Sequence, residues 1–266
     1  EYVINVGPQH PATHGVLRFR VSLEGEIIKK LDVHCGYIHR GIEKMCEELT
    51  YPQTLALTDR LDYLGASQNR HALCMCIEKG LGVEVPERVQ YIRTIMDELQ
   101  RIDSHLLFFA CLCMDMGALT AFFYGFRDRE KVLDILEQTT GGRLIQTYNT
   151  IGGVQADIHP DFVRKVKEFI AYMRPVLREY HEIFTGNVIA QERLKGTGVL
   201  TREDAISFGA TGGTGRAAGW ACDVRKRHPY AVYGKVDFEE VLFTEGDCLA
   251  RYMVRMRAVS YTHLTL

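Results

Sequence analysis

Apolar and polar residues alternate near the start of the chain. Apolar side chains take every second position through residues 16–23, and a second apolar run covers residues 27–33 after the turn Glu24-Gly25-Glu26. A period of two is typical of a strand with one buried face, and a short glycine turn between two such runs is typical of a hairpin. The pattern predicts an antiparallel hairpin in this segment.

From about Arg40 onward the spacing of apolar residues becomes helical. One stretch follows Pro86, and its apolar residues recur at intervals of three and four: Val89, Ile92, Met96, Leu99, Ile102 and Leu106. A second stretch repeats this spacing at Phe162, Val166, Phe169, Met173, Leu177 and Tyr180. Each stretch predicts a long amphipathic helix, and Pro175 inside the second one predicts a kink.

These patterns predict a mainly α chain with a small N-terminal antiparallel β-sheet, an α+β architecture. Its 266 residues suffice for one large domain or two modest ones. We expect an N-terminal hairpin region at residues 1–36, a helical core at residues 37–257 and a tail at residues 258–266.

An apolar run at residues 106–126 is nearly as long as the roughly 20 residues that cross a bilayer. Asp115 and Gly117 interrupt it near the middle. Because a carboxylate is unfavourable against lipid, two buried helices that meet at a functional break are a better interpretation than a membrane span.

Charge is nearly balanced, with Lys+Arg 32, Asp+Glu 34 and a net charge of −2. This balance gives no broad basic surface for nucleic acid. The short basic run at residues 225–228 is typical of a solvated face or a partner contact. The glycine-rich segment 211–219 lacks the Gly-Lys-Ser/Thr ending of a phosphate-binding loop, so close helix packing is favoured there.

Eight cysteines raise the question of a metal site or disulfides. The two close pairs, at residues 74 and 76 and at 111 and 113, fall in predicted helices. Side chains two residues apart on a helix point about 200° apart, so a pair cannot share one tetrahedral ion. With no secretory signal, we expect reduced cytoplasmic thiols packed as small apolar residues.

Residues 7–15 read Gly-Pro-Gln-His-Pro-Ala-Thr-His-Gly, so prolines and glycines place His10 and His14 on a defined loop. Either ring could cap a turn by bonding a nearby carbonyl, which is an ordinary role for a loop histidine. A shared metal ion is disfavoured, because a spacing of four aligns two imidazoles only on a helix. Proton donation to a bound substrate is the third alternative.

Three further polar groups could do chemistry: Thr-Asp-Arg-Leu-Asp-Tyr at residues 58–63, Asp115, and Arg40 with Glu43. Each also has an ordinary role. Tyr63 could be a core tyrosine with a satisfied hydroxyl, and Asp115 could cap the helix after the break. Arg40 and Glu43 could form a surface pair. Their chemistry becomes significant only if the side chains converge.

Long motifs follow one another in a fixed order, at residues 7–15, 39–44, 59–63, 98–106, 115–120, 122–130 and 223–226. In these motifs, from about Ile4 to Met256, the chain resembles the D-type (forty-nine-kilodalton-type) subunit family of NADH:quinone oxidoreductase, the hydrogenase-large-subunit-like core component of respiratory complex I. The resemblance implies a helical core like that of the large subunit of nickel–iron hydrogenases.

The resemblance also implies a quinone-reduction site. His14 and Tyr63 match the residues that hydrogen-bond the quinone headgroup, and Asp115 matches the aspartate that holds this histidine. Arg40 and Arg60 match arginines near a 4Fe–4S cluster on a neighbouring subunit, which supplies the electrons. His14 and Tyr63 would give or polarise protons, and quinone reduction would be coupled to proton translocation.

The implied protein is a peripheral component at the cytoplasmic face of the cell membrane, without a span of its own. Its partners would be the Fe–S cluster subunit, other peripheral-arm subunits and the membrane-arm quinone-channel subunit. Its substrate would be menaquinone or ubiquinone. The chain alone would bind no cofactor, no metal and no nucleic acid.

Three departures from related sequences change these expectations. Nickel–iron hydrogenases carry Cys-X-X-Cys ligand motifs, whereas the corresponding segment here, residues 60–65, reads Arg-Leu-Asp-Tyr-Leu-Gly. Ile145 stands where many family members have a histidine near the cluster, so we expect a lower and less pH-dependent cluster potential, compatible with menaquinone. Residues 258–266 match nothing in the family, so we expect a chain truncated at both ends, a candidate non-native tail, and exposed apolar surface that partners cover.

Other functions stay open at this point. The chain could be a structural scaffold that binds the cluster subunit without touching quinone. It could also belong to a ferredoxin-driven or F420-driven quinone oxidoreductase or to a membrane-bound hydrogenase, because the electron donor binds other subunits. Of the two loop histidines, His14 is the predicted quinone ligand and His10 a supporting residue.

Overall fold

The computed structural model of the protein describes residues 2–7 and 17–260. It contains two compact units, residues 1–57 and residues 58–266. The predicted boundary between residues 36 and 37 stays a prediction. The described elements are β1 (Tyr2–Val6), β2 (Arg18–Glu24), β3 (Ile27–His34), α1 (Ile42–Glu48), α2 (Tyr51–Thr58), α3 (Ala66–Leu81), α4 (Glu87–Asp115), α5 (Leu119–Thr140), β4 (Asn149–Thr150), β5 (Gly153–Val154), α6 (Phe162–Tyr180), the π-helix η1 (His181–Thr185), α7 (Val188–Leu194), α8 (Arg202–Ser207), α9 (Gly212–Ala217), α10 (Val224–Arg227) and α11 (Cys248–Ala258).

The first unit begins with an antiparallel sheet in the order β1-β2-β3. β2 and β3 form the predicted hairpin. Gly25, at φ +62°, lies in the turn that brings Glu24 opposite Ile27. The pairing shifts between Ser22 and Leu23, which is an irregularity of the β-bulge kind. β1 pairs with β2 along its length and was not part of the sequence-based prediction.

Much of the apolar surface of this sheet is exposed. Val21 is buried, whereas the exposed apolar residues of the outer strands are Tyr2, Val3, Ile4, Val6, Ile27, Ile28, Leu31 and Val33. The alternation predicts one fully buried face, and the structure does not provide it. α1 has no buried residue among those described, so it does not act as a second layer. Exposed apolar surface of this extent is typical of an interaction surface.

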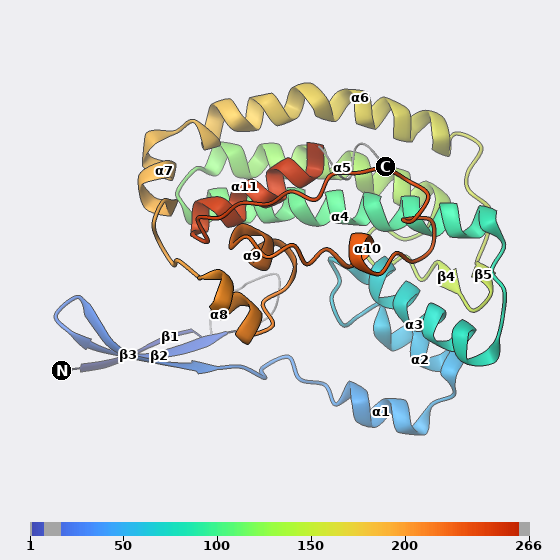
Figure 1. The fold of residues 1–266 in the computed structure, drawn as a ribbon, viewed down its shortest axis with the longest axis horizontal. Coiled ribbons are helices and arrows are strands. Elements are labelled where there is room, and N and C mark those ends of the chain that lie inside the picture. Colours follow the sequence, from blue (N-terminus) through green and yellow to red (C-terminus); the bar gives the residue numbers. More distant parts are fainter. Residues whose placement is uncertain (1, 8–16, 261–266) are drawn as a thin grey trace. The chain divides into compact units, whose positions relative to one another are not determined.

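The second unit is built around three long helices, α4, α5 and α6 (Figure 1). α5 packs against both α4 and α6. The two predicted amphipathic helices are α4 and α6, and their predicted apolar residues lie in the core, except that Val89 and Val166 are half-buried. The mainly α architecture with a small antiparallel sheet is thus confirmed.

α4 and α5 approach closely at Gly125. A Cβ atom at this position would lie 2.8 Å from the Cβ of Ala110 and 3.1 Å from the carbonyl oxygen of Leu106. Glycine is therefore required here by the packing of the two helices rather than by its own backbone conformation.

The apolar run at residues 106–126 is divided at the predicted break. α4 ends at Asp115, Gly117 takes φ +85°, and α5 begins at Leu119. The N-cap position of α5 is Ala118, so the interpretation of Asp115 as the cap of this helix is wrong. Within the described ranges, no helix combines the length and apolar character needed to cross a membrane.

Pro175 lies inside α6, which continues into η1. Proline has no backbone N–H, so outside the first turn of a helix it leaves one helical hydrogen bond unmade. Pro175 therefore removes one backbone hydrogen bond from α6. The predicted kink stays a prediction. Short π-helical segments occur frequently near functional sites, and η1 supplies the buried Phe184 to the core.

The glycine-rich segment 211–219 includes α9, which packs against α11. A Cβ atom on Gly215 would lie 2.6 Å from the carbonyl oxygen of Ala210. Ala217 shares a small apolar cluster with Ala250 and Val254 of α11. The prediction of close helix packing is confirmed.

The basic run at residues 225–228 is only partly a solvated face. Arg225 is 4% exposed, and it donates from Nη1 to Glu98 at 3.1 Å and from Nη2 to Asp223 at 2.6 Å. The prediction is therefore wrong for Arg225, although the other three residues are exposed. Glu98 lies on α4, so a local charge pattern could not reveal this buried ion pair.

The eight cysteines are all free thiols. In each close pair one member is buried, Cys74 or Cys113, and the other is not, as expected for residues two apart on a helix. Burial raises the pKa of Cys74 to about 11 and that of Cys113 to about 12. Cys74 and Cys113 therefore pack as small apolar residues, as expected. Cys35 and Cys76 are exposed instead, and the remaining four cysteines are half-buried.

Candidate functional site

The turn between α2 and α3 carries Arg60 and Tyr63. Asp62 fixes its backbone, because Oδ1 accepts a hydrogen bond from the Leu64 amide at 3.0 Å and the carbonyl oxygen accepts one from Gly65 at 3.0 Å. A side chain that bonds the amide two residues ahead forms an Asx turn. This turn leaves Arg60 exposed and Tyr63 half-buried.

Asp59 anchors the start of this turn in the protein interior. It is 1% exposed, and its Oδ2 lies 2.9 Å from Nη1 of Arg70 on α3. The side chain of Thr147 also bonds to this carboxylate. Burial raises the pKa of Asp59 above its ordinary value, although Arg70 opposes the shift. The group is held in place and is easier to protonate than an exposed aspartate.

A second buried acid, Asp97 on α4, continues this polar cluster. Its Oδ1 accepts a hydrogen bond from Oγ of Ser67 at 2.7 Å, and its Oδ2 lies 2.7 Å from Nδ1 of His71. Asn149 on β4 donates from Nδ2 to the carbonyl oxygen of Ser67 at 3.2 Å, and its own carbonyl oxygen accepts from Nε of Arg70. These bonds form one buried network: His71, Asp97, Ser67, Asn149, Arg70 and Asp59.

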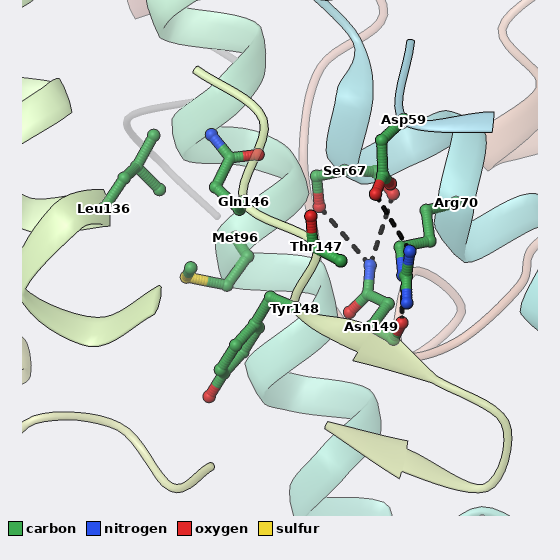
Figure 2. A pocket seen from close by; sticks show the side chains of 9 residues that line it. All are labelled: Asp59, Ser67, Arg70, Met96, Leu136, Gln146, Thr147, Tyr148 and Asn149. Carbon is green, nitrogen blue, oxygen red and sulfur yellow. Dashed lines mark hydrogen bonds and ion pairs between the residues drawn. The ribbon is translucent and has the colours of Figure 1, made fainter. Parts of the chain in front are cut away.

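A small cavity of about 10 Å³ lies beside this network (Figure 2). Its lining residues are Asp59, Ser67, Arg70, Met96, Leu136, Gln146, Thr147, Tyr148 and Asn149. Thr147 takes φ +50°, a left-handed conformation that a β-branched residue rarely adopts. Backbone strain of this kind persists only where the surroundings hold it, and here the Thr147 side chain bonds to Asp59.

Arg40 and Arg60, the two arginines predicted to lie near the Fe–S cluster of a neighbouring subunit, belong to different units. Arg60 is exposed on the turn of the second unit, and Arg40 is exposed just before the Gly41 N-cap of α1 in the first. Ile145 is half-buried and directly precedes the cavity-lining segment 146–149. The structure thus places Arg60, Tyr63 and this segment within one unit.

Asp115 lies elsewhere on the second unit. It is exposed at the end of α4, eighteen residues (115 − 97 = 18) beyond Asp97, which corresponds to roughly 27 Å along the helix axis. Ser67 ties the Tyr63 turn to α4 at the level of Asp97. Asp115 and Tyr63 are therefore not brought together by α4 alone. A hollow of about 190 Å³ adjoins the break after Asp115, and it is lined by Met116, Gly117, Ala118, Phe184, Asn187, Ile189 and Ala190.

His10 and His14 lie outside the described residues, so their predicted roles stay predictions. Among the residues that the structure does describe, no group of three or more His, Cys, Asp or Glu side chains could hold a metal ion.

Sequence reasoning missed the buried polar network around Asp59. A signal was present, because polar residues of α3 recur at intervals of three and four on its buried face: Ser67, Arg70, His71, Cys74 and Glu78. Such a polar stripe indicates a helix whose inner face is paired with other polar groups. The partners Asp97 and Asn149 could not be identified, because they lie on distant segments.

Comparisons with known proteins agree with these motifs. The family model described as "Respiratory-chain NADH dehydrogenase, 49 Kd subunit" matches residues 115–262. The C/D subunit of the NADH-quinone oxidoreductase of Phocaeicola vulgatus is 88% identical over 259 residues, covering 97% of this chain and 50% of that protein. The D subunit of the enzyme of Geobacillus thermodenitrificans is 45% identical over 259 residues, covering 97% of this chain and 71% of that protein.

A third relative, the D 2 subunit of the NADH-quinone oxidoreductase of Sinorhizobium medicae, is 44% identical over 256 residues, covering 96% of this chain and 63% of that protein. The chain spans about half the length of the C/D relatives. The match nevertheless extends over almost all of this chain. The chain therefore belongs to the family of the 49 kDa subunit of respiratory-chain NADH dehydrogenase, which includes the D subunits of NADH-quinone oxidoreductases.

Proposed function

We propose that the chain forms part of the quinone-reduction site of a proton-translocating NADH-quinone oxidoreductase. In this proposal His14 and Tyr63 hydrogen-bond the quinone headgroup, and Asp115 holds His14. Arg40 and Arg60 lie near a 4Fe–4S cluster held by a neighbouring subunit, from which the electrons come. The quinone is menaquinone or ubiquinone.

The observation that carries the proposal is the rigid mounting of Tyr63. The Asx turn at Asp62 fixes the backbone around it, and the buried Asp59–Arg70 ion pair fixes the start of the turn. A side chain that donates to a reacting group must be held in a productive geometry, because small displacements lower the rate steeply. The names of the relatives support quinone as the substrate class.

The chemistry of these side chains suits a quinone. The phenol of Tyr63 can donate a hydrogen bond to a carbonyl oxygen that gains negative charge on reduction. An imidazole titrates near neutrality, so His14 can deliver a proton at physiological pH. A carboxylate partner such as Asp115 favours the protonated imidazole.

The separation of Asp115 from the Tyr63 turn sets a geometric requirement. The proposal therefore requires that Asp115 contact His14 and that the headgroup contact both His14 and Tyr63. Arg60 lies on the same turn as Tyr63 and is exposed. Positive charge near an acceptor cluster favours its reduced form, which suits an arginine on the electron-entry side.

The proposal also assigns partners and location. The Fe–S cluster subunit, the other peripheral-arm subunits and the membrane-arm quinone-channel subunit would cover the exposed surfaces of this chain. The protein would lie peripherally at the cytoplasmic face of the cell membrane. The exposed apolar residues of the sheet are consistent with such covering.

The test is Tyr63→Phe in the complete NADH-quinone oxidoreductase. Loss of the hydroxyl removes the proposed proton donor and keeps the ring, so we expect quinone reduction to fall about 100-fold or more. Tyr91→Phe is the matched control, since Tyr91 is 40% exposed on α4 and outside the site. Reduction of the cluster by NADH and assembly of the complex should remain intact in both variants.

Unchanged quinone turnover in the assembled Tyr63→Phe complex would refute the proposal. It would instead support the second candidate, a structural scaffold that binds the cluster subunit without touching quinone. Loss of assembly in Tyr63→Phe but not in Tyr91→Phe would also favour the scaffold.

A further inference from the structure

The cavity beside Asp59 has the dimensions of a site for one water molecule. Its volume of about 10 Å³ corresponds to the space that the centre of a single water occupies. Met96, Leu136 and the ring of Tyr148 line one part of it, and the remaining lining is polar (Figure 2). Cavities that stay dry in proteins are apolar, so the polar lining distinguishes this cavity from a packing defect.

Two buried amide side chains in the lining carry the inference. Gln146 is 6% exposed and Asn149 is 1% exposed. Neither Nε2 nor Oε1 of Gln146 has a hydrogen-bond partner among the described residues, and the same holds for Oδ1 of Asn149. Buried polar groups in folded proteins are nearly always paired with protein atoms or with ordered water.

The orientation of Asn149 is fixed by its other hydrogen bond. Nδ2 donates to the carbonyl oxygen of Ser67, so Oδ1 is the atom left to accept. A donor is therefore needed at this position. Among the other lining groups, Arg70 bonds Oδ2 of Asp59 and the Asn149 carbonyl oxygen, whereas Oδ1 of Asp59 is a further buried acceptor without a partner among the described residues.

We propose that this cavity binds one water molecule, which donates to Oδ1 of Asn149 and pairs with the side-chain amide of Gln146. A second donated hydrogen bond, to the unpartnered Oδ1 of Asp59, joins the segment 146–149 to the start of the turn that bears Tyr63. The water is a positioning element rather than a reactant. The water site stands on the cavity and its lining, whereas any effect of the water on turnover rests on the proposed quinone site.

The first test is a density map of the complete complex at a resolution that shows ordered water. A peak within hydrogen-bond distance of both Gln146 and Asn149 is expected in the unmodified protein. A map that shows ordered water elsewhere in the helical unit and none at this position would overturn the inference.

The second test compares two matched variants. Gln146→Leu keeps the approximate shape of the side chain and removes both amide atoms, so the water peak should disappear. Gln68→Leu makes the same change on α3 outside the cavity lining, and the peak should remain. A peak that persists in Gln146→Leu, or that is lost equally in both variants, would contradict the assigned partners.

Measurements of kcat/KM for quinone distinguish the presence of the water from its effect on turnover. With the water lost, the turn is less well held, and we expect a several-fold fall in kcat/KM for Gln146→Leu with Gln68→Leu unchanged. Loss of the peak with unchanged kcat/KM would support the water site and refute its positioning role. Because the Tyr63→Phe result does not depend on this water, failure of the proposed function is recognised independently.

Discussion

An aspartate is buried at two places in the helical unit: Asp128 in the seam between α5 and α6, and Asp59 in the turn between α2 and α3. The hydrogen bonds that these two carboxylates make differ. Asp128 in the seam accepts from Tyr172 at 2.6 Å and from Tyr180 at 2.5 Å, and both oxygens also bond Arg127. Asp59 in the turn bonds Arg70 and Thr147 beside a cavity. Both oxygens of Asp128 are hydrogen-bonded and hold the helices together, whereas Asp59 keeps one oxygen without a partner beside the cavity.

The largest effect is expected at Asp128. Asp128→Asn replaces one acceptor oxygen by an NH2 group that faces a buried tyrosine hydroxyl, and it removes the charge that Arg127 faces, so the free energy of unfolding should fall by about 2–3 kcal/mol. Denaturant unfolding of the protein measures this loss. The control is Glu179→Gln, because Glu179 pairs with the same arginine at the surface and such pairs contribute about 1 kcal/mol or less. Equal losses in the two variants would show that the seam does not depend on its buried charge.

A smaller effect is expected at Asp59. Asp59→Asn keeps an oxygen that can accept from Arg70, and burial already favours the neutral form of Asp59. The free energy of unfolding should fall by about 1–2 kcal/mol, as for the loss of one charge-assisted hydrogen bond. The same unfolding experiment at neutral pH measures it. A loss as large as that of Asp128→Asn would show that the two carboxylates contribute equally to stability and would contradict the difference between the two regions.

The smallest effect concerns pH and a third buried acid, Asp103, which lies 2.8 Å from Nε of Arg129. Burial raises the pKa of Asp103 to about 6, although Arg129 opposes the shift. The folded state therefore binds this proton more tightly than the unfolded state. The stabilisation is complete below the unfolded pKa near 4 and is lost as the pH rises through about 6.

From pH 7 to pH 5 this group should add about 1 kcal/mol to the free energy of unfolding. Unfolding curves of the unmodified protein and of Asp103→Asn at both pH values isolate the contribution. If the two proteins respond identically to pH, Asp103 does not titrate in this range.

The sequence predicted those parts of the fold whose signal repeats locally. The hairpin, α4 and α6 follow from periods of two and 3.6 residues, and the break at Asp115 and Gly117 follows from two residues that interrupt an apolar run. β1 was missed because five residues give little periodicity, and its strand pairing depends on β2.

The buried charges could not be predicted for a related reason. Arg225 looks like part of a surface run until Glu98 and Asp223 are seen around it. Asp59 and Tyr63 were recognised through the family motif, but Asn149 and Gln146 belong to a segment about 80 residues further along the chain. The polar stripe on α3 signals that buried partners exist, but long-range pairing leaves no local pattern that identifies them, so Asp97 and Asn149 emerged only from the structure.

The two edge strands of the sheet differ in charge. β3 carries Lys29, Lys30 and Asp32, whereas β1 carries no charged residue among Tyr2–Val6. Charged side chains on an edge strand discourage the addition of further strands, and an uncharged apolar edge invites it. Until a partner covers it, we therefore expect the β1 edge, rather than the β3 edge, to be where strands of other copies add to this sheet.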